Sequence, residues 1–199
     1  LAPLSIFKHT FKLLPGHYLH IDTKKQNHSL IKYWDVFDAY NKPKLQIGEQ
    51  EAKAELKSLL ISACEYRMVS DVPVGVFLSG GYDSTAVTAL LQTSRTDKLK
   101  TFTIGFHEED HNEAQHAKKV AEYLQTDHTE YYCAPEDALA IIPSLPEIYD
   151  EPFADNSTVP TVLVSRLARK SVTVALSGDG GDEIFGGYNK FNRSLALAK

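Results

Sequence analysis

Residues 74–84 read Val-Gly-Val-Phe-Leu-Ser-Gly-Gly-Tyr-Asp-Ser, an apolar run that passes directly into small and polar residues. A stretch with helix-like composition, residues 84–91, follows at once. A strand that leads through a turn of small residues into the start of a helix presents unpaired backbone amides to an anion. The sequence therefore predicts a phosphate-binding loop at residues 79–84.

The side chains of this loop suit a phosphate and a metal ion together. Gly80 and Gly81 let the backbone approach an anion closely and adopt positive φ. Ser79 and Ser84 add hydroxyl donors, and Ser84 is also placed to cap the next helix. Asp83 would repel a phosphate unless a divalent cation lay between them, and Mg²⁺ prefers carboxylate oxygen. We therefore interpret Asp83 as a metal ligand. The loop lacks the lysine of the G-x-x-x-x-G-K-[ST] motif, so a different nucleotide reaction is predicted.

The same residues also fit a simple Gly-Gly turn into a capped helix, with Asp83 only favouring the helix dipole. A second motif favours the site. Residues 177–183 read Ser-Gly-Asp-Gly-Gly-Asp-Glu, Ile-Phe-Gly-Gly-Tyr follows at 184–188, and the segment again comes straight after an apolar run. Three carboxylates in five residues repel one another, but beside ATP they offer a second Mg²⁺ ligand and a general base. A solvated calcium-type loop is the alternative, although its spacing does not fit an EF-hand.

Strand-like and helix-like segments alternate along most of the chain. Expected strands are 74–78, 100–105, 128–132 and 172–176, and expected helices are 49–68, 84–92, 112–124, 135–142 and 157–170. This order predicts an α/β fold of the doubly wound type, a parallel sheet with helices on both faces. Ligands of such sheets bind beyond the carboxyl ends of the strands, so the loops after Leu78, Gly105 and Leu176 should converge.

The first forty residues differ from this pattern. Residues 7–14, a Pro15-Gly16 turn, residues 17–22 and residues 30–36 read as a short β hairpin with a trailing strand. The polar segment 42–50 suits a linker, so we expect a β-rich piece over residues 1–41 and an α/β domain over residues 49–199. The chain starts at Leu1 and ends in a helix-forming run without a stop signal, and we expect it to be a piece of a longer protein.

Composition argues against several other classes. A net charge of −5 over 199 residues is not typical of a nucleic-acid-binding surface. No apolar run approaches the roughly 20 residues that cross a bilayer, and no signal-peptide layout is present, so we expect no membrane partner and a cytoplasmic location. Cys64 and Cys133 lack metal-ligand spacing and are expected to be reduced, partly buried thiols. His107 and His111, which bracket an acidic run, are expected to lie in a solvated loop.

Together the two motifs resemble the synthetase domain of glutamine-hydrolysing asparagine synthetases of the bacterial B type, within the ATP-pyrophosphatase (PP-loop) superfamily. Residues 101–106, Thr-Phe-Thr-Ile-Gly-Phe, and 150–155, Asp-Glu-Pro-Phe-Ala-Asp, also look like segments of that family. The match covers about residues 49–193. The first motif alone fits the wider superfamily, whereas the second is more specific. Residues 1–36 resemble the end of the family's N-terminal glutaminase domain and the hinge.

The resemblance implies a reaction in two steps. Aspartate and ATP·Mg²⁺ give β-aspartyl-AMP and pyrophosphate, and ammonia derived from glutamine then releases asparagine and AMP. The implied pyrophosphate and metal residues are Ser79, Gly80, Gly81, Asp83, Ser84 and Asp182, and the implied nucleoside residues are Phe77, Ile104, Ser177 and Gly178. Asp179 matches a glutamate proposed as proton acceptor, and it is one methylene shorter. Asp155 and Tyr188 are weaker candidates for substrate contact, with a helix cap and a core residue as their respective alternatives.

The resemblance also sets expectations about the parent protein. The family's glutaminase nucleophile is an N-terminal cysteine and Leu1 is not one, so this chain is expected not to hydrolyse glutamine. Lysines that the family places later in the synthetase domain would fall beyond Lys199, so this chain alone is expected to bind nucleotide but not to complete the synthesis. The expected partners are aspartate, ATP, ammonia and a glutaminase domain in the parent chain, with a homodimer as a further hypothesis. Two alternatives are a related synthetase that amidates another carboxylate, and a truncated nucleotide-binding module without catalysis.

Overall fold

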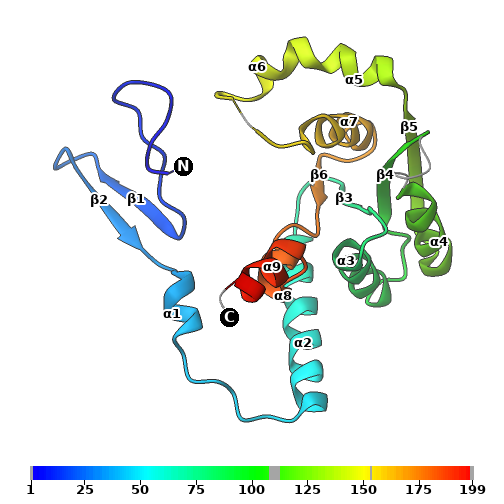
Figure 1. The fold of residues 1–199 in the computed structure, drawn as a ribbon, viewed down its shortest axis with the longest axis horizontal. Helices are drawn as coiled ribbons and strands as arrows, with labels where there is room; N and C mark the ends of the chain where they lie inside the picture. Colours follow the sequence, from blue (N-terminus) through cyan, green and yellow to red (C-terminus); the bar gives the residue numbers. More distant parts are fainter. Residues whose placement is uncertain (1, 108–112, 153, 198–199) are drawn as a thin grey trace. The chain divides into compact units, whose positions relative to one another are not determined.

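The computed structural model describes residues 2–107, 113–152 and 154–197, and the chain divides into two compact units (Figure 1). One unit comprises Leu1–Gly48 with Tyr149–Phe153, and the other comprises Glu49–Ile148 with Ala154–Lys199. The short segment around Glu151 joins the first unit through polar contacts. Its carboxylate forms an ion pair with Lys12 and accepts a hydrogen bond of 3.2 Å from the amide of Ile6.

The first unit contains one antiparallel hairpin, built from β1 (His17–Asp22) and β2 (Asn27–Lys32). The turn between them is held by Asp22, whose carboxylate accepts from the amides of Lys24 and Lys25, each at 3.0 Å. The sequence predicts a hairpin between residues 7–14 and 17–22, whereas the structure pairs residues 17–22 with residues 27–32. The predicted strand over residues 7–14 is wrong, because a local turn with His9 at φ 61 interrupts it and leaves only an isolated bridge between Leu4 and Phe11.

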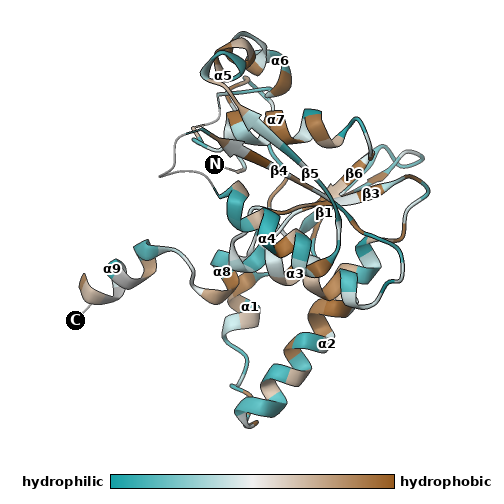
Figure 2. Cartoon of the chain, turned by 90° about the vertical axis from the view of Figure 1, so that its right-hand side faces the viewer, coloured by the Kyte–Doolittle hydropathy of each residue, from teal (hydrophilic) through white to brown (hydrophobic). Residues whose placement is uncertain are grey.

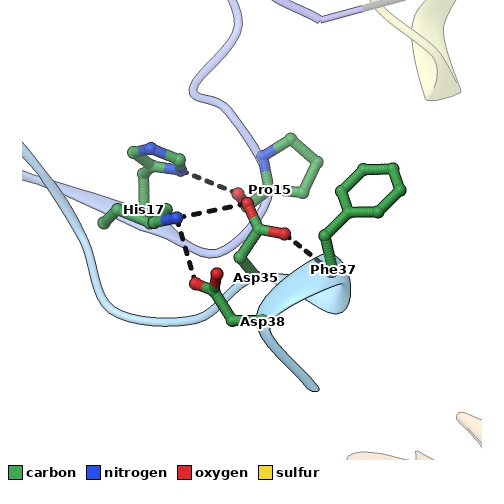
Figure 3. Close-up of polar contacts among 6 residues, drawn as sticks. Pro15, His17, Asp35, Phe37 and Asp38 are labelled. Carbon is green, nitrogen blue, oxygen red and sulfur yellow. Dashed lines mark hydrogen bonds and ion pairs between the residues drawn. The ribbon is translucent and has the colours of Figure 1, made fainter. Parts of the chain in front are cut away.

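The predicted trailing strand over residues 30–36 is confirmed only for residues 30–32, which belong to β2, because the chain leaves the strand there and enters a short helix, α1 (Val36–Tyr40). Asp35 starts this helix by accepting a hydrogen bond of 2.8 Å from the amide of Phe37, as Figure 3 shows. That bond lowers the pKa of Asp35, and the carboxylates of Asp38 and Asp35 raise the pKa of Lys32. Lys32 lies 3.1 Å from Asp38 and 3.4 Å from Asp35, so the end of β2 and the start of α1 share one exposed charge cluster.

The second unit is built on a four-stranded parallel sheet, which confirms the predicted α/β fold class. The strands lie in the order β5-β4-β3-β6, with β3 at Val74–Phe77, β4 at Lys100–Phe106, β5 at Asp127–Cys133 and β6 at Val174–Leu176. The register is continuous across the sheet, with Val76 opposite Thr101 on one side and Leu176 on the other. All four strands had been predicted from sequence to within two residues at each end.

The five helices predicted for this unit are confirmed. They are α2 (Glu49–Arg67), α3 (Tyr82–Thr93), α4 (Ala114–Leu124), α5 (Pro135–Ile141) and α7 (Thr158–Ala168). Residue 112, the expected start of the third of them, lies outside the described residues. The structure adds a 3-10 turn, η2 (Ile142–Ser144), and the short helices α6 (Leu145–Ile148), α8 (Gly181–Phe185) and α9 (Asn189–Leu197).

Helices cover both faces of the sheet, as Figure 2 shows with α7 on one side and α3 and α4 on the other. The alternation of side chains along the strands explains this arrangement. Phe77, Phe102 and Ile104 pack on one face against Val164 and Ala168 of α7. On the opposite face, Val76 packs with residues of α2 and α3, and Leu78 packs with Ala117 and Ala121 of α4. The core therefore fixes the strand ends from both sides.

Both cysteines are buried thiols, as expected, and neither forms a disulfide. His107 is exposed and its ring lies 5.8 Å from that of Tyr132, whereas His111 lies outside the described residues. In the described part of the chain, no helix combines the length and the apolar character that crossing a bilayer requires.

Candidate functional site

A cavity of about 1010 Å³ opens at the carboxyl end of the sheet in the second unit. Its walls come from residues 77–79 and 81–84 at the end of β3 and after it, from the carboxyl half of β4, from the segment between Ser177 and Tyr188 after β6, and from the first half of α7. The predicted convergence is confirmed for the loops after Leu78 and Leu176. Phe106 and Glu113 bring the two ends of the loop after Gly105 to the same cavity, and residues 108–112 lie outside the described residues. We call residues 79–84 the first loop and residues 177–188 the second loop.

The first loop is closed on itself by its two serines. Ser84 Oγ accepts from the amide of Ser79 at 3.2 Å and lies 2.9 Å from Ser79 Oγ, which in turn accepts from the amide of Gly81 at 3.3 Å. Ser84 is only 6% exposed. The expectation that Ser84 caps the next helix is wrong, because α3 begins earlier, with Gly81 as its N-cap. Ser84 instead holds the loop in its curved shape while still lining the cavity.

Gly80 has a different role from its neighbour. It adopts φ +84, and a Cβ at this position would lie 2.7 Å from the amide nitrogen of Ala117 in α4. Gly80 therefore lets the loop pack closely on α4, and unlike Gly81 it does not line the cavity. Gly80 therefore shapes the turn of the first loop and does not itself contact the contents of the cavity.

The second loop contains a single helical turn, α8, where the sequence had indicated only an acidic loop. The turn starts after Gly180 at φ +93 and ends at Gly186 at φ +73. The amides of Gly186 and Gly187 both donate to the carbonyl of Asp182, at 2.9 and 3.1 Å. Asp-Glu ahead of Ile-Phe, with Gly-Gly directly after, is the sequence signal that could have predicted it.

The two loops touch through glycines. A Cβ on Gly178 would lie 2.8 Å from the amide nitrogen of Ser84, and one on Gly181 would lie 2.2 Å from a carboxylate oxygen of Asp83. The Asp83 carboxylate therefore lies against the backbone of the residue that precedes Asp182. The carboxylate of Asp182 lies against Gly187 in the same way, because a Cβ there would be 1.8 Å from its Oδ1. Close approach of these backbones brings both aspartates to one cavity.

The structure gathers nearly all the predicted site residues in this cavity. Its lining includes Phe77, Ser79, Gly81, Asp83, Ser84, Ile104, Ser177, Gly178, Asp179 and Asp182. Gly80 is the exception. Phe77 and Ile104 lie on the wall nearest α7, whereas the loop residues form the polar wall.

The two weaker candidates, Asp155 and Tyr188, differ in whether they line the cavity. Asp155 does not line the cavity, and its carboxylate accepts from the amide and the hydroxyl of Ser157 at 2.8 and 2.7 Å, bonds that lower its pKa. Asp155 therefore belongs to the start of α7. Tyr188 does line the cavity and is not a core residue, since it is only partly buried. Its hydroxyl donates to Glu183 at 2.9 Å, which raises the pKa of Tyr188.

Several lining residues were missed from sequence. Glu113 precedes α4, Ser157 and Thr161 lie at the start of α7, and Phe102 and Phe106 extend the apolar wall from β4. The alternation along β4 could have identified Phe102 as a partner of Phe77. The position of α7 over the sheet could not be obtained from its sequence.

The lining is acidic on its polar side. Asp83, Glu113, Asp179, Asp182 and Glu183 contribute carboxylates, and no lysine, arginine or histidine is among the described lining residues. Within the described part of the chain, no group of three or more His, Cys, Asp and Glu side chains is placed to hold a metal ion. A cation held by Asp83 and Asp182 would thus need further oxygens from a ligand or from water. Mg²⁺ fits such a site, because it commonly binds one or two carboxylates together with phosphate oxygens and waters.

The sequence is similar to a large group of known proteins. The family model described as asparagine synthase matches residues 55–199. A putative asparagine synthetase [glutamine-hydrolyzing] 2 from Methanocaldococcus jannaschii is 46% identical over 191 residues, which cover 94% of this chain and 36% of the relative.

Two further relatives show how widely the similarity extends. Asparagine synthetase [glutamine-hydrolyzing] 1 from Bacillus subtilis is 34% identical over 98% of this chain and 30% of its own length. The asparagine synthetase [glutamine-hydrolyzing] from Zea mays is 37% identical over 70% of this chain and 25% of its own length. The chain therefore spans about a third or less of the length of these relatives.

Proposed function

Because the chain belongs to the asparagine synthase family, we propose that its second unit is the ATP-binding part of an asparagine synthetase. The proposed reaction activates the side-chain carboxylate of aspartate with ATP and then converts the acyl adenylate into the amide. The observation that carries the proposal is the meeting of the first and second loops, with Asp83 and Asp182, at one cavity.

In the first step, a carboxylate oxygen of aspartate attacks the α-phosphorus of ATP. A bond from that oxygen to phosphorus forms, the bond to the bridging oxygen breaks, and pyrophosphate leaves. The first loop supports this step because it lines the cavity at the start of α3, and its serine hydroxyl network holds it in a fixed curve. The wall formed by Phe77, Ile104 and Phe102 suits the flat, apolar face of the adenine.

Asp83 and Asp182 are the residues that would hold Mg²⁺. When bound, the ion offsets the negative charge that develops on the leaving pyrophosphate. The two carboxylates come from different loops, so the contact at Gly178 and Gly181 determines whether both can reach the same ion.

In the second step, ammonia attacks the carbonyl carbon of the β-aspartyl adenylate, and AMP leaves. The nitrogen must lose a proton as the amide forms, and a carboxylate in the cavity can accept it. Asp179 lines the cavity between Gly178 and Gly180, and its amide donates to Ser177 Oγ at 3.4 Å. We propose Asp179 as this proton acceptor. The ammonia would come from glutamine, hydrolysed by a glutaminase domain elsewhere in the full-length protein.

Exchange of labelled pyrophosphate into ATP tests the first step directly. With the full-length protein, aspartate is expected to stimulate exchange, whereas glutamate and sugar acids are not. Exchange that ignores aspartate but responds to another carboxylic acid would refute asparagine synthesis and point to a related amidating enzyme. No exchange with any acid, despite binding of ATP, would favour a nucleotide-binding module.

The role of Asp179 has its own test. Replacement by Asn removes the proton-accepting charge and keeps the size of the side chain. The D179N variant should keep aspartate-dependent exchange within about threefold and lose at least about tenfold in amide formation at saturating ammonia. Undiminished amide formation would remove Asp179 from the mechanism.

A further inference from the structure

The cavity has an imbalance of charge that its own lining does not resolve. Its described lining residues supply five carboxylates and no basic side chain. A triphosphate chain is itself strongly anionic, so like charges would face one another across the cavity even with a divalent cation between Asp83 and Asp182. A positive side chain close to the cavity would offset this repulsion.

Lys190 is such a side chain. It is the second residue of α9, and its Nζ lies 4.0 Å from the centroid of the Tyr188 ring and 5.7 Å from that of Phe191. Tyr188 is part of the cavity wall. The ammonium therefore lies directly against a ring that lines the cavity.

The ring that carries Lys190 is held in place. The hydroxyl of Tyr188 donates to Glu183 Oε1 at 2.9 Å, and Glu183 belongs to α8, next to Asp182. The Tyr188 and Phe191 rings lie 5.7 Å apart at an interplanar angle of 50°. The contacts thus link Lys190 through Tyr188 to the same helical turn that positions the Asp182 carboxylate.

Lys190 also has hydrogen-bonding capacity to spare. Within the part of the chain that the structure describes, no carboxylate lies within ion-pairing distance of its ammonium, unlike Lys118, which pairs with Glu130 at 3.2 Å. The face of an aromatic ring attracts an ammonium but does not accept conventional hydrogen bonds from it, whereas a phosphate oxygen does. An incoming phosphate would therefore compete well with the Tyr188 ring for the ammonium.

From this arrangement we propose that Lys190 is a phosphate-binding residue of the site, whose ammonium turns from the Tyr188 ring to the β- or γ-phosphate of the nucleotide. The inference rests on the proposed function, since it names one more residue that holds the same ligand. Tyr188 is then a positioning residue, because it carries the lysine without itself contacting the phosphate.

Isothermal titration of Mg·ATP and of AMP into the full chain tests this assignment. The K190M variant, which keeps the length of the side chain without its charge, is expected to bind Mg·ATP about tenfold more weakly, the factor for losing one charged hydrogen bond. K190R should stay within about threefold of the wild type, since it retains the charge. AMP lacks the β- and γ-phosphates, so its affinity should be the same in all variants.

The matched control is K170M. Lys170 is exposed just after the C-terminal end of α7, whereas the cavity lies at the other end of that helix. Equal Mg·ATP affinity of K190M and wild type would overturn the assignment of Lys190 and leave the proposed function standing. Equal losses for AMP and Mg·ATP would also overturn it, because the effect would then not follow the phosphates. A wild-type chain that binds no Mg·ATP would instead refute the proposed function, and the Lys190 assignment with it.

Discussion

At the scale of single residues, the site depends on where side chains are missing. Gly178 and Gly181 let the second loop lie against Asp83 and Ser84, and Gly187 leaves room for the Asp182 carboxylate. Each of these positions meets backbone or carboxylate atoms closely enough that an added methyl group would have to displace them. These glycines therefore allow Asp83 and Asp182 to line the same cavity.

Replacing Gly178 by Ala tests this dependence. The new methyl group would lie 2.8 Å from the amide nitrogen of Ser84, and backbone cannot yield as a flexible side chain does. We expect a loss of about 1–3 kcal/mol in the free energy of unfolding, typical of overpacking, and at least about tenfold weaker binding of Mg·ATP.

The control for this change is G48A, because a Cβ at Gly48 meets nothing within 4 Å. Denaturant unfolding and ATP titration should show G48A close to the wild type in both measurements. Wild-type values for G178A would mean that the two loops do not need their close contact.

A histidine far from the cavity makes stability depend on pH. His128 Nδ1 lies 2.8 Å from Thr101 Oγ1, and its Nε2 is buried with no hydrogen-bond partner among the described residues. Burial lowers the pKa of His128 below its ordinary 6.5, against a smaller opposing effect of Glu130. The unfolded chain therefore takes up the proton first as the pH falls, so this contribution to stability is full above about pH 6.5 and declines below it.

Urea unfolding between pH 7.5 and 5 measures this contribution. H128N keeps a polar group near Thr101 but cannot titrate, so its free energy of unfolding should fall less steeply with decreasing pH than that of the wild type. Parallel curves for the two proteins would exclude His128 as a source of the pH dependence.

At the scale of elements, a single carboxylate organises the start of α5. Asp137, in the first turn of α5, accepts from the amide of Ala134 at 2.9 Å and from the hydroxyl of Tyr131 at 2.8 Å. The first of these bonds is the larger cause of its lowered pKa. One carboxylate thus joins the end of β5 to the start of α5.

The D137A variant should lower the free energy of unfolding by about 1 kcal/mol, the usual effect of losing a helix cap. E136A is the comparison, since Glu136 also lies in the first turn and can favour the helix dipole, but no hydrogen bond to the preceding backbone is described for it. Thermal unfolding of both variants measures the difference. A loss of stability in E136A as large as that in D137A would contradict the capping role of Asp137.

Elements of the second unit could be predicted because their signals are local. Residues 74–78 form a short apolar run that passes into Ser-Gly-Gly, and residues 101–104 alternate threonine with apolar side chains. Glu49–Arg67 has helical spacing. The hairpin of the first unit was paired wrongly because residues 7–14 have strand-like composition, whereas a turn at His9 breaks them. Such a turn depends on contacts such as Ser5 Oγ to the carbonyl of Thr10, at 2.8 Å, which no periodicity reveals.

At the scale of the molecule, strand order turns distant motifs into neighbours. β3 pairs with β6, although nearly a hundred residues separate them, and so the loop after each opens into the same cavity. The alternation of strands and helices predicted this convergence. It could not predict that Gly80 faces α4, that Glu113 and the start of α7 join the wall, or that Asp155 turns away to Ser157. Those outcomes depend on how the helices pack on the sheet.

The central claim is that the first and second loops form one magnesium-dependent ATP site. Titration of ATP into the full chain, with Mg²⁺ and then with EDTA, tests it most directly, with D83N as the matched variant. The account predicts binding with Mg²⁺ that becomes at least about tenfold weaker when the metal is removed or Asp83 is neutralised. Equal affinity with and without Mg²⁺, or a D83N variant that binds Mg·ATP like the wild type, would contradict it.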